Sequence, residues 1–192
     1  MQTLRVCGLI LAGGKARRFG GDKRFASLGG EALINHGIRA LQPQVEELIL
    51  SCNDTIPGWE DLVHLADQRA QEGPLLGIAE GLAYALDEGF DWLLTAPADS
   101  PFLPADLRKR LVGFDPVITF AESGGQVHPV FGAWPTMLTP ALFAEIAKGE
   151  RKIDRAATAI SQVKTFEWET RDGDPFFNVN RAEDLKVAEA RL

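Results

Sequence analysis

Glycines and cations gather between residues 13 and 24, and this stretch offers the clearest chemistry in the sequence. Glycine lets main-chain N–H groups turn toward an anion and lets the anion approach closely. A quarter of the 20 Lys and Arg residues lie here, although the formal net charge of the chain is −7. The stretch therefore predicts a binding site for a polyanion such as a chain of phosphates. Its glycines are Gly13, Gly14, Gly20 and Gly21, and its charged residues are Lys15, Arg17, Arg18, Asp22, Lys23 and Arg24.

The cations in this stretch differ in the role that we expect of them. Lys23 offers a point charge for a phosphate, and Arg17 or Arg18 offers a bidentate fork. Arg24 is expected to be a charge in solvent. The spacing excludes a P-loop, because no Gly-Lys-Ser/Thr follows, and it also excludes a Gly-x-Gly-x-x-Gly fingerprint. The alternative to an anion site is a solvated, glycine-rich surface loop.

A second candidate group is the carboxylate of Asp99, which lies between Pro97 and Pro101 after an apolar run. A hard oxygen ligand in a rigid setting is what Mg²⁺ requires when it binds together with phosphates. The alternative is that Asp99 caps a helix over residues 103–111. The three histidines have no spacing suited to zinc, so we expect no zinc site.

Other polar side chains follow predicted strands. Ser51, Asn53 and Asp67 each stand at or just beyond a strand's carboxyl end, where Asp67 could bind a nucleoside or open an Asx turn. Asn178 and Asn180 alternate on an extended segment, which would put both amides on one face. They are expected to contact a substrate, and Asn180 is also a candidate N-cap for a last helix over 181–192.

The elements that must position these residues follow from apolar patterning. Uninterrupted apolar runs predict buried strands over 4–11, 45–51, 62–66 and 91–96, and helical periodicity predicts helices between them over 31–41 and 75–86. Further helices are expected over 104–112, 140–148 and 151–160, a strand over 162–168, and two antiparallel strands over 117–122 and 126–134. The fold class is therefore three-layer α/β, a mostly parallel sheet with helices on both faces and a small antiparallel excursion. Ligands of such sheets bind beyond the carboxyl ends of the strands.

Composition bounds the class of protein. With 192 residues, 45% of them hydrophobic and 24% charged, residues 1–192 are expected to form a single domain. The chain is acidic and has no basic stripe interleaved with aromatic residues, so we expect no nucleic-acid partner. It also has no long apolar window and no signal peptide, so we expect no membrane partner and a cytoplasmic location. Cys7 and Cys52 are expected to be reduced packing residues.

Taken in order, these motifs resemble those of the molybdenum cofactor guanylyltransferases along most of the chain. The residues that carry the resemblance are Leu-Ala-Gly-Gly-x-x-x-Arg-x-Gly-x-Asp-Lys over 11–23, Ser51-Cys52-Asn53, Asp67, Gly73-Pro74-Leu75 with Gly77, Pro97-Ala98-Asp99-Ser100-Pro101, His128-Pro129 and Asn178-Val179-Asn180. One departure is Gly30-Glu31-Ala32-Leu33, where relatives show Gly-Lys-Pro-Leu, so no cationic role is expected at position 31.

The resemblance implies a nucleotide-diphospho-sugar-transferase-like variant of the Rossmann fold and the transfer of GMP from GTP to the terminal phosphate of molybdopterin or its molybdenum form. It implies GTP contacts from Leu11, Ala12, Gly13, Gly14, Lys23, Ser51, Asn53, Asp67 and Asp99. It implies molybdopterin contacts from Arg18, Gly21, Asn178 and Asn180. Lys23, Asp99 and Arg17 would be the catalytic residues, with Mg²⁺ on Asp99. The partners would be these two substrates together with other cofactor-biosynthesis or molybdoenzyme-chaperone proteins, and the chain would be a monomer.

Three functions stay open on the sequence. A molybdopterin cytidylyltransferase or another NTP-dependent nucleotidyltransferase shares the first motif, although cytidylyltransferases more often show Leu-Ala-Ala-Gly. A non-catalytic nucleotide-binding adaptor for cofactor delivery is the alternative from another class. In the transfer reaction no general base is needed, because a phosphate nucleophile with a second pKa of about 6 is largely ionised near neutral pH.

Overall fold

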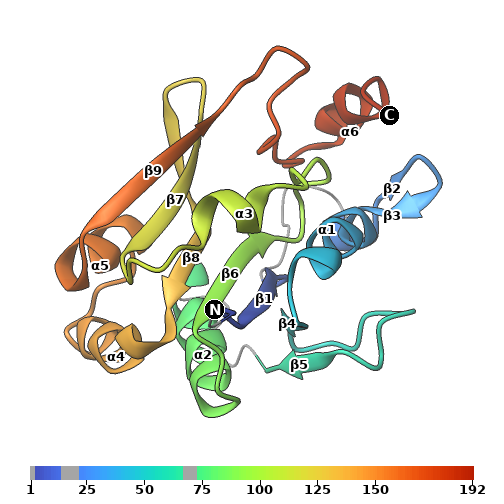
Figure 1. Ribbon diagram of the computed structural model, residues 1–192. Coiled ribbons are helices and arrows are strands. Elements are labelled where there is room, and N and C mark those ends of the chain that lie inside the picture. The colour runs from blue at the N-terminus through green and yellow to red at the C-terminus, as the bar shows by residue number, and fades with distance from the viewer. Residues whose placement is uncertain (1–2, 14–21, 67–72) are drawn as a thin grey trace.

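The main sheet of the computed structural model, which describes residues 3–13, 22–66 and 73–192, contains seven strands in the order β5-β4-β1-β6-β8-β7-β9 (Figure 1). Six of these strands run the same way, because β8 alone pairs antiparallel with both of its neighbours. The mostly parallel sheet predicted from the apolar runs is confirmed. The strands are β1 (Val6–Leu11), β4 (Glu47–Ser51), β5 (Val63–Leu65), β6 (Trp92–Pro97), β7 (Ile118–Ser123), β8 (Gln126–Pro135) and β9 (Val163–Trp168).

The register of the four central parallel strands brings their carboxyl ends level. Leu11 of β1 pairs with Ser51 of β4 on one side and with Pro97 of β6 on the other, and Ser51 pairs in turn with Leu65 of β5. Short backbone hydrogen bonds continue this alignment past the strands, from Ala12 N to Ser51 O at 3.0 Å and from Ala98 N to Leu11 O at 3.0 Å. Whatever follows these strands therefore meets at one edge of the sheet.

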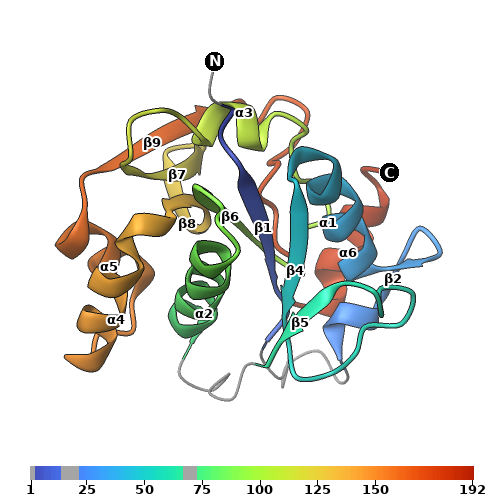
Figure 2. The same cartoon turned by 60° about the horizontal axis from the view of Figure 1, so that its bottom comes forward.

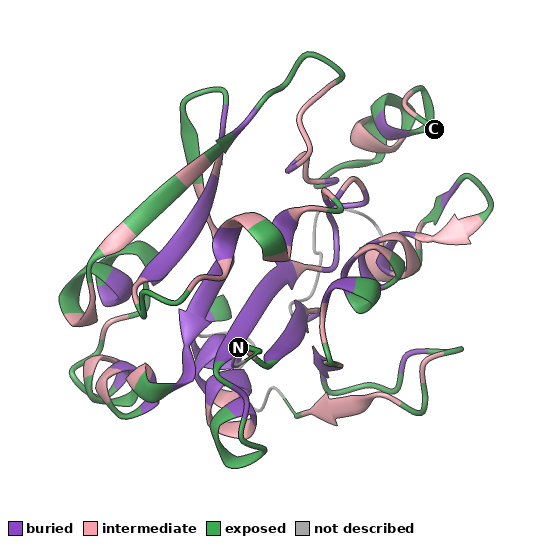
Figure 3. Cartoon of the chain, viewed as in Figure 1, coloured by how far each residue is buried: buried purple, intermediate pink, exposed green. Residues whose placement is uncertain are grey.

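Helices cover both faces of this sheet, as predicted, because the residues of β1 are buried on alternate sides. Val6 and Ile10 face a core shared with α1 (Leu33–Leu41) and α3 (Leu107–Leu111). Cys7 and Leu9 face a core shared with α2 (Pro74–Asp87), α4 (Thr139–Ala147) and α5 (Ile153–Ile160). Figure 2 shows the two groups of helices on either side of the sheet, and Figure 3 shows that the central strands are buried.

The antiparallel excursion is the β7–β8 hairpin, which turns at Gly124-Gly125. Proline in a strand often marks an edge, but Pro129 lies in β8, which has β6 and β7 as its neighbours in the sheet. The register between β7 and β8 shifts here, because Phe120 pairs with Gly132 while Ala121 pairs with His128. Pro129 therefore lies in a bulge, where a missing N–H breaks no ladder hydrogen bond.

A small second sheet and the last helix pack together beside α1. Strands β2 (Ser27–Leu28) and β3 (Glu31–Ala32) pair antiparallel across Gly29 and Gly30, whose φ values of 58° and 86° explain why glycines make this turn. Helix α6 (Ala182–Glu189) packs on them through a small apolar cluster, which also joins the segments after β6 and before α6. This cluster comprises Leu28, Leu33, Val179 and Ala188, with Phe102, Phe177 and Leu185 packed against it.

Both cysteines are buried and neither is in a disulfide, so the prediction that they are reduced packing residues is confirmed. Burial, together with the nearby charge of Glu47, raises the pKa of the Cys7 thiol to about 12, so Cys7 is not a reactive nucleophile. Over the three described ranges, every helix is too short or too polar to cross a bilayer.

Candidate active site

The edge where the central strands end holds an ion pair between Lys23 and Asp99, which lie 76 residues apart in the sequence. Lys23 opens a short 3-10 turn (Lys23–Phe25), whose N-terminus is capped by Asp22 because its carboxylate accepts a hydrogen bond from Arg24 N at 3.1 Å. Asp99 follows β6 directly. The two side chains are 21% and 12% exposed, so the charges meet in a partly desolvated position. The sequence placed both residues at this edge, and the structure brings them into contact.

The C-terminal segment reaches the same pair. Val179 N donates to the carbonyl oxygen of Asp99 at 2.9 Å, and Lys23 Nζ lies 3.4 Å from Asn180 Oδ1. Residues separated by up to 157 positions thus converge on one lysine. Two of the predicted substrate-facing residues, Lys23 and Asn180, are therefore neighbours.

Asn180 is not the N-cap of the last helix, contrary to one of the two roles expected of it. The cap residue is Arg181, and the carboxylate of Asp184 accepts hydrogen bonds from Asn180 N at 2.7 Å and Arg181 N at 2.8 Å. An acidic side chain in the first turn supplies the oxygen that satisfies these backbone donors. This arrangement leaves the amide of Asn180 directed to Lys23 rather than to the helix.

Several buried oxygen atoms around this edge have no hydrogen-bond partner among the described residues: Asp99 Oδ1, Ser100 Oγ, Asn178 Oδ1 and Ser51 Oγ. Burying a polar atom without a partner costs about 1–3 kcal/mol, so such atoms ordinarily have one. Their clustering in residues that end β4, follow β6 or precede α6 is the pattern of a site that a polar ligand completes. Sequence reasoning missed Ser100, because nothing in its type or spacing distinguishes it.

Ser51 ends β4 and Asn53 lies just beyond it, as predicted, but they are exposed to different degrees. Ser51 is 1% exposed and lies under the start of α2, where a Cβ on Gly77 would come within 2.8 Å of Ser51 Oγ and 3.0 Å of Leu11 Cδ2. Asn53 is exposed. A glycine in the first turns of α2 thus lets this helix approach the strand ends closely.

Six of the predicted site residues lie outside the described ranges or at their border. Gly14, Arg17, Arg18, Gly21 and Asp67 fall in residues 14–21 and 67–72, which the structure does not describe. Gly13 is the last described residue before the first of these gaps, and it is exposed.

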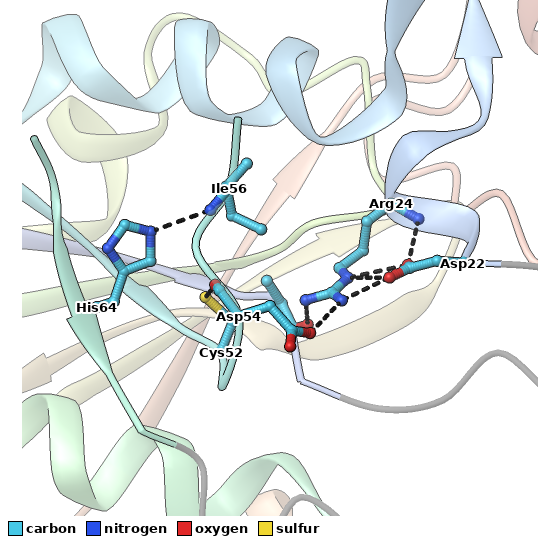
Figure 4. A network of polar contacts seen from close by, with 7 residues as sticks. Asp22, Arg24, Cys52, Asp54, Ile56 and His64 are labelled. Atoms are coloured by element: carbon cyan, nitrogen blue, oxygen red, sulfur yellow. Dashed lines mark hydrogen bonds and ion pairs between the residues drawn. The ribbon is translucent and has the colours of Figure 1, made fainter. Parts of the chain in front are cut away.

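Arg24 is not the solvent charge that the sequence suggested. Its side chain is 13% exposed, and Figure 4 shows its guanidinium between three segments. It donates from Nε to Asp22 Oδ1 at 2.9 Å, from Nη1 to the carbonyl oxygen of Ala12 at 3.1 Å, and from Nη2 to Asp54 Oδ2 at 3.0 Å. The hydrogen bond from Arg24 holds the pKa of the Asp22 carboxyl below its usual range, and the two carboxylates raise that of Arg24.

His128 belongs to a polar cluster that ties the β7–β8 hairpin to the segment before α6. Ser123 Oγ donates to Asp174 Oδ1 at 2.8 Å and lies 2.8 Å from His128 Nε2. Because the serine proton is directed to Asp174, the imidazole donates to the serine and cannot act as its base. Burial lowers the pKa of His128, so the ring is neutral near pH 7. The cluster thus connects the hairpin to the segment before α6 and is not a nucleophilic triad.

The chain is similar to known proteins along most of its length. A family model described as "MobA-like NTP transferase domain" matches residues 8–163. A protein of Cereibacter sphaeroides named molybdenum cofactor guanylyltransferase is 40% identical over 193 residues, covering 98% of both chains, and one of the same name from a Bradyrhizobium strain is 38% identical over 97% of this chain and 93% of the other. The chain belongs to the molybdenum cofactor guanylyltransferase family.

Solved structures show the same fold at lower identity. Molybdopterin-guanine dinucleotide biosynthesis protein A from Archaeoglobus fulgidus has a TM-score of 0.75 and 22% identity over 96% of this chain and 97% of that one. The 2-C-methyl-D-erythritol 4-phosphate cytidylyltransferase of Thermus thermophilus has a TM-score of 0.69 and 18% identity over 95% and 96%. At these identities the likeness supports the fold alone, and the nucleotidyltransferase-like fold expected from the sequence is confirmed.

The two parts of the candidate site differ in whether the family model covers them. Ala12, Lys23, Ser51 and Asp99 lie inside the region that the family model matches, which ends at residue 163. Asn178 and Asn180 lie beyond it, although the full-length relatives cover this segment. The family model therefore covers the strand-end part of the candidate site and ends before its C-terminal part.

Proposed function

We propose that this chain transfers GMP from GTP to the terminal phosphate of molybdopterin or of its molybdenum form, and that the products are the guanine dinucleotide cofactor and pyrophosphate. The observation that carries the proposal is the meeting of Lys23, Asp99 and Asn180 at the carboxyl edge of the sheet. Family membership supports the same reaction, because relatives at about 40% identity bear that name over nearly their whole length.

The reaction is a displacement between two anions. A terminal phosphate oxygen of molybdopterin attacks the α-phosphorus of GTP, the new P–O bond forms, and the bond to the β-phosphate oxygen breaks so that pyrophosphate leaves with the electron pair. The nucleophile needs no general base, because a phosphate monoester is largely ionised near neutral pH. The protein's task is to align the reactants and offset their charge.

Each described residue has a definite part in that task. Lys23 binds phosphate oxygens of GTP as a point charge and stabilises the developing charge. Gly13, which begins the Gly-Gly run, offers a main-chain N–H to the same phosphates. Arg17 is proposed as a further catalytic cation on the grounds of its motif alone. Leu11, Ala12, Gly14, Ser51, Asn53 and Asp67 are proposed to line the rest of the GTP site.

Asp99 would hold Mg²⁺, and the residues present fit that ion. Asp99 Oδ1 is a buried carboxylate oxygen without a hydrogen-bond partner in the described part of the chain. Among those residues no group of three or more His, Cys, Asp or Glu side chains could hold a metal by itself. Mg²⁺ commonly takes one or two carboxylates and completes its shell with substrate phosphates and water. The bound ion supplies charge neutralisation at the phosphates.

The acceptor is proposed to bind on the C-terminal side. Asn178 and Asn180 would contact molybdopterin together with Arg18 and Gly21, which lie in the range that the structure does not describe. Asn178 Oδ1 is buried and lacks a partner among the described residues, which supports a role in binding a donor on the ligand.

The test is turnover with purified protein, molybdopterin, Mg²⁺ and either GTP or CTP, followed as pyrophosphate release and as the dinucleotide product. We expect product with GTP, little product with CTP, and loss of turnover in Asp99→Asn. A preference for CTP would make the chain a cytidylyltransferase. Nucleotide binding without pyrophosphate release would favour the adaptor for cofactor delivery, and full turnover in Asp99→Asn would refute the metal role.

The chain is also proposed to act as a single-domain monomer in the cytoplasm and to hand its product to other cofactor-biosynthesis or molybdoenzyme-chaperone proteins. Light scattering of the purified protein tests the monomer, and one cooperative unfolding transition tests the single domain. A dimer mass or two resolved transitions would contradict these parts of the proposal.

A further inference from the structure

Two arginines form hydrogen bonds with residues at opposite ends of the same two strands, β1 and β4. At the carboxyl ends of β1 and β4, Arg24 contacts Ala12 and Asp54. At their amino ends, Arg108 donates to the carbonyl oxygen of Leu4 at 3.0 Å and to Glu46 Oε1 at 2.8 Å. The Arg108 side chain is 28% exposed and that of Arg24 is 13% exposed. These are similar networks, and only one of them borders the active site.

We propose that Arg24 is a positioning residue for the phosphates of the bound nucleotide, an inference that rests on the proposed function. Arg24 holds two pieces of the site in a fixed relation: the Ala12–Gly13 peptide and the turn that starts at Lys23. It does so through contacts at 2.9–3.1 Å to Asp22 and to the Ala12 carbonyl. Asp54, on the loop after β4, anchors the guanidinium from a third side.

The Ala12 carbonyl matters because a peptide group is planar and trans. Its C=O and the N–H of the next residue point in opposite directions, so fixing one fixes the other. Ala12 N is held by Ser51 O at 3.0 Å and Ala12 O is held by Arg24 at 3.1 Å. The N–H of Gly13 is therefore directed away from the guanidinium, and its orientation is set before any phosphate arrives.

The Asp22 contact fixes Lys23 in the same way. Asp22 accepts from Arg24 N at 3.1 Å and also from the Arg24 side chain, so the turn that carries Lys23 is closed at its start. The backbone position from which Lys23 Nζ reaches Asp99 is therefore set before the nucleotide binds. Preorganisation of this kind lowers the entropy that binding must offset.

Arg24 does not bind the phosphates itself. Asp22, Asp54 and Ala12 engage its Nε and both of its terminal nitrogens. The two carboxylates also leave the net charge around the guanidinium negative, which would repel an anion. The arginine therefore acts through its neighbours, and a lysine in its place cannot do so, because an ammonium group lacks the planar fork that spans several acceptors.

The test compares Arg24→Lys with Arg108→Lys in the full chain. We expect Arg24→Lys to raise the Kd for GTP with Mg²⁺ about tenfold by calorimetry, while the KM for molybdopterin changes less than about twofold. Both variants should lower the melting temperature by similar amounts, but Arg108→Lys should leave the Kd for GTP within about twofold of the wild-type value. If both variants lose stability alike and both bind GTP as wild type does, Arg24 is merely structural and the inference is overturned.

A second variant keeps the test decisive if Arg24→Lys does not fold. Asp22→Asn preserves shape but removes the charge and one of the two oxygens that accept from the guanidinium, so it should raise the Kd for GTP about threefold. An unchanged Kd in a folded Asp22→Asn would overturn the inference. Failure of the wild-type chain to bind GTP at all would instead refute the proposed function, and the inference with it.

Discussion

The Lys23–Asp99 ion pair allows a quantitative test of how the active site is held in the absence of substrate. The perturbation is a double-mutant cycle of Lys23→Met, Asp99→Asn and the double variant. Methionine keeps an unbranched side chain of similar length and asparagine keeps the shape of aspartate, so the cycle isolates the charge interaction. The contact of Lys23 with Asn180 is absent from both variants that lack the lysine, and it cancels.

The magnitude follows from the burial of the two side chains, which are 21% and 12% exposed. Two unit charges about 4 Å apart at an effective dielectric constant of about 20 attract by about 4 kcal/mol. Ordering a lysine side chain costs up to about 2 kcal/mol of rotamer entropy. A coupling free energy of about 2 kcal/mol remains, which lies between the values typical of exposed pairs and of fully buried pairs.

The assay is urea unfolding of the four proteins at pH 7 without ligand, with stability taken from the midpoint and slope of each curve. A matched control cycle uses Lys164 and Asp115, a pair 2.6 Å apart whose side chains are 43% and 62% exposed. We expect its coupling to be below about 0.5 kcal/mol. A Lys23–Asp99 coupling no larger than that of the control would refute the claim that the site is partly desolvated and held by this pair.

Three further predictions address other parts of the molecule. Gly77→Ala should destabilise the chain by about 1–3 kcal/mol in the same urea assay, because the new methyl group would come within 2.8 Å of Ser51 Oγ. Gly37→Ala also lies in a helix, but no atom of the described residues is nearer than 3.8 Å to its new methyl group. This change should stabilise the chain by up to about 1 kcal/mol. Equal effects of the two changes would contradict the close approach of α2. Because burial lowers the pKa of His128 below 6.5, its contribution to stability is full above pH 6.5 and is lost as the pH falls toward the folded-state pKa. The stability of wild type should therefore fall more steeply than that of His128→Gln between about pH 7 and 5, and parallel curves would argue against it. Asp184→Asn should raise the KM for molybdopterin several-fold, because Asp184 accepts the hydrogen bonds from Asn180 N and Arg181 N. Glu183→Gln, on the same turn, should leave this KM unchanged. If the Kd for GTP rises as much as the KM for molybdopterin, the effect is a general loss of structure.

The parts of the fold that the sequence predicted are those that depend on burial alone. A strand covered on both faces is apolar at nearly every position, so Val6–Leu11 and Trp92–Pro97 were evident without coordinates. Their parallel pairing then required the residues that follow, Asp99 among them, to share an edge. The contact of Asp99 with Lys23 follows from topology more than from any local pattern.

The parts that it did not predict depend on side chains that reach across the fold. Arg24 was expected in solvent because its partners, Asp54 and the Ala12 carbonyl, lie 30 and 12 residues away and form no sequence pattern. Asn180 was a reasonable cap by residue type, but the helix begins one residue later than such a cap requires, and Arg181 is its N-cap. Several site residues, such as Arg17 and Asp67, lie outside the described ranges, so their roles stay predictions.

The 157-residue separation between Lys23 and Asn180 has a consequence for biosynthesis of the chain. On the ribosome, β1, β4 and β6 emerge well before the segment that carries Asn180, and loops of this length close slowly. A nascent chain with these three strands in place would still lack the segment that is proposed to bind molybdopterin. Binding of this acceptor would therefore await the synthesis and docking of the C-terminal segment, whereas the strand-end groups proposed to bind GTP would already be present.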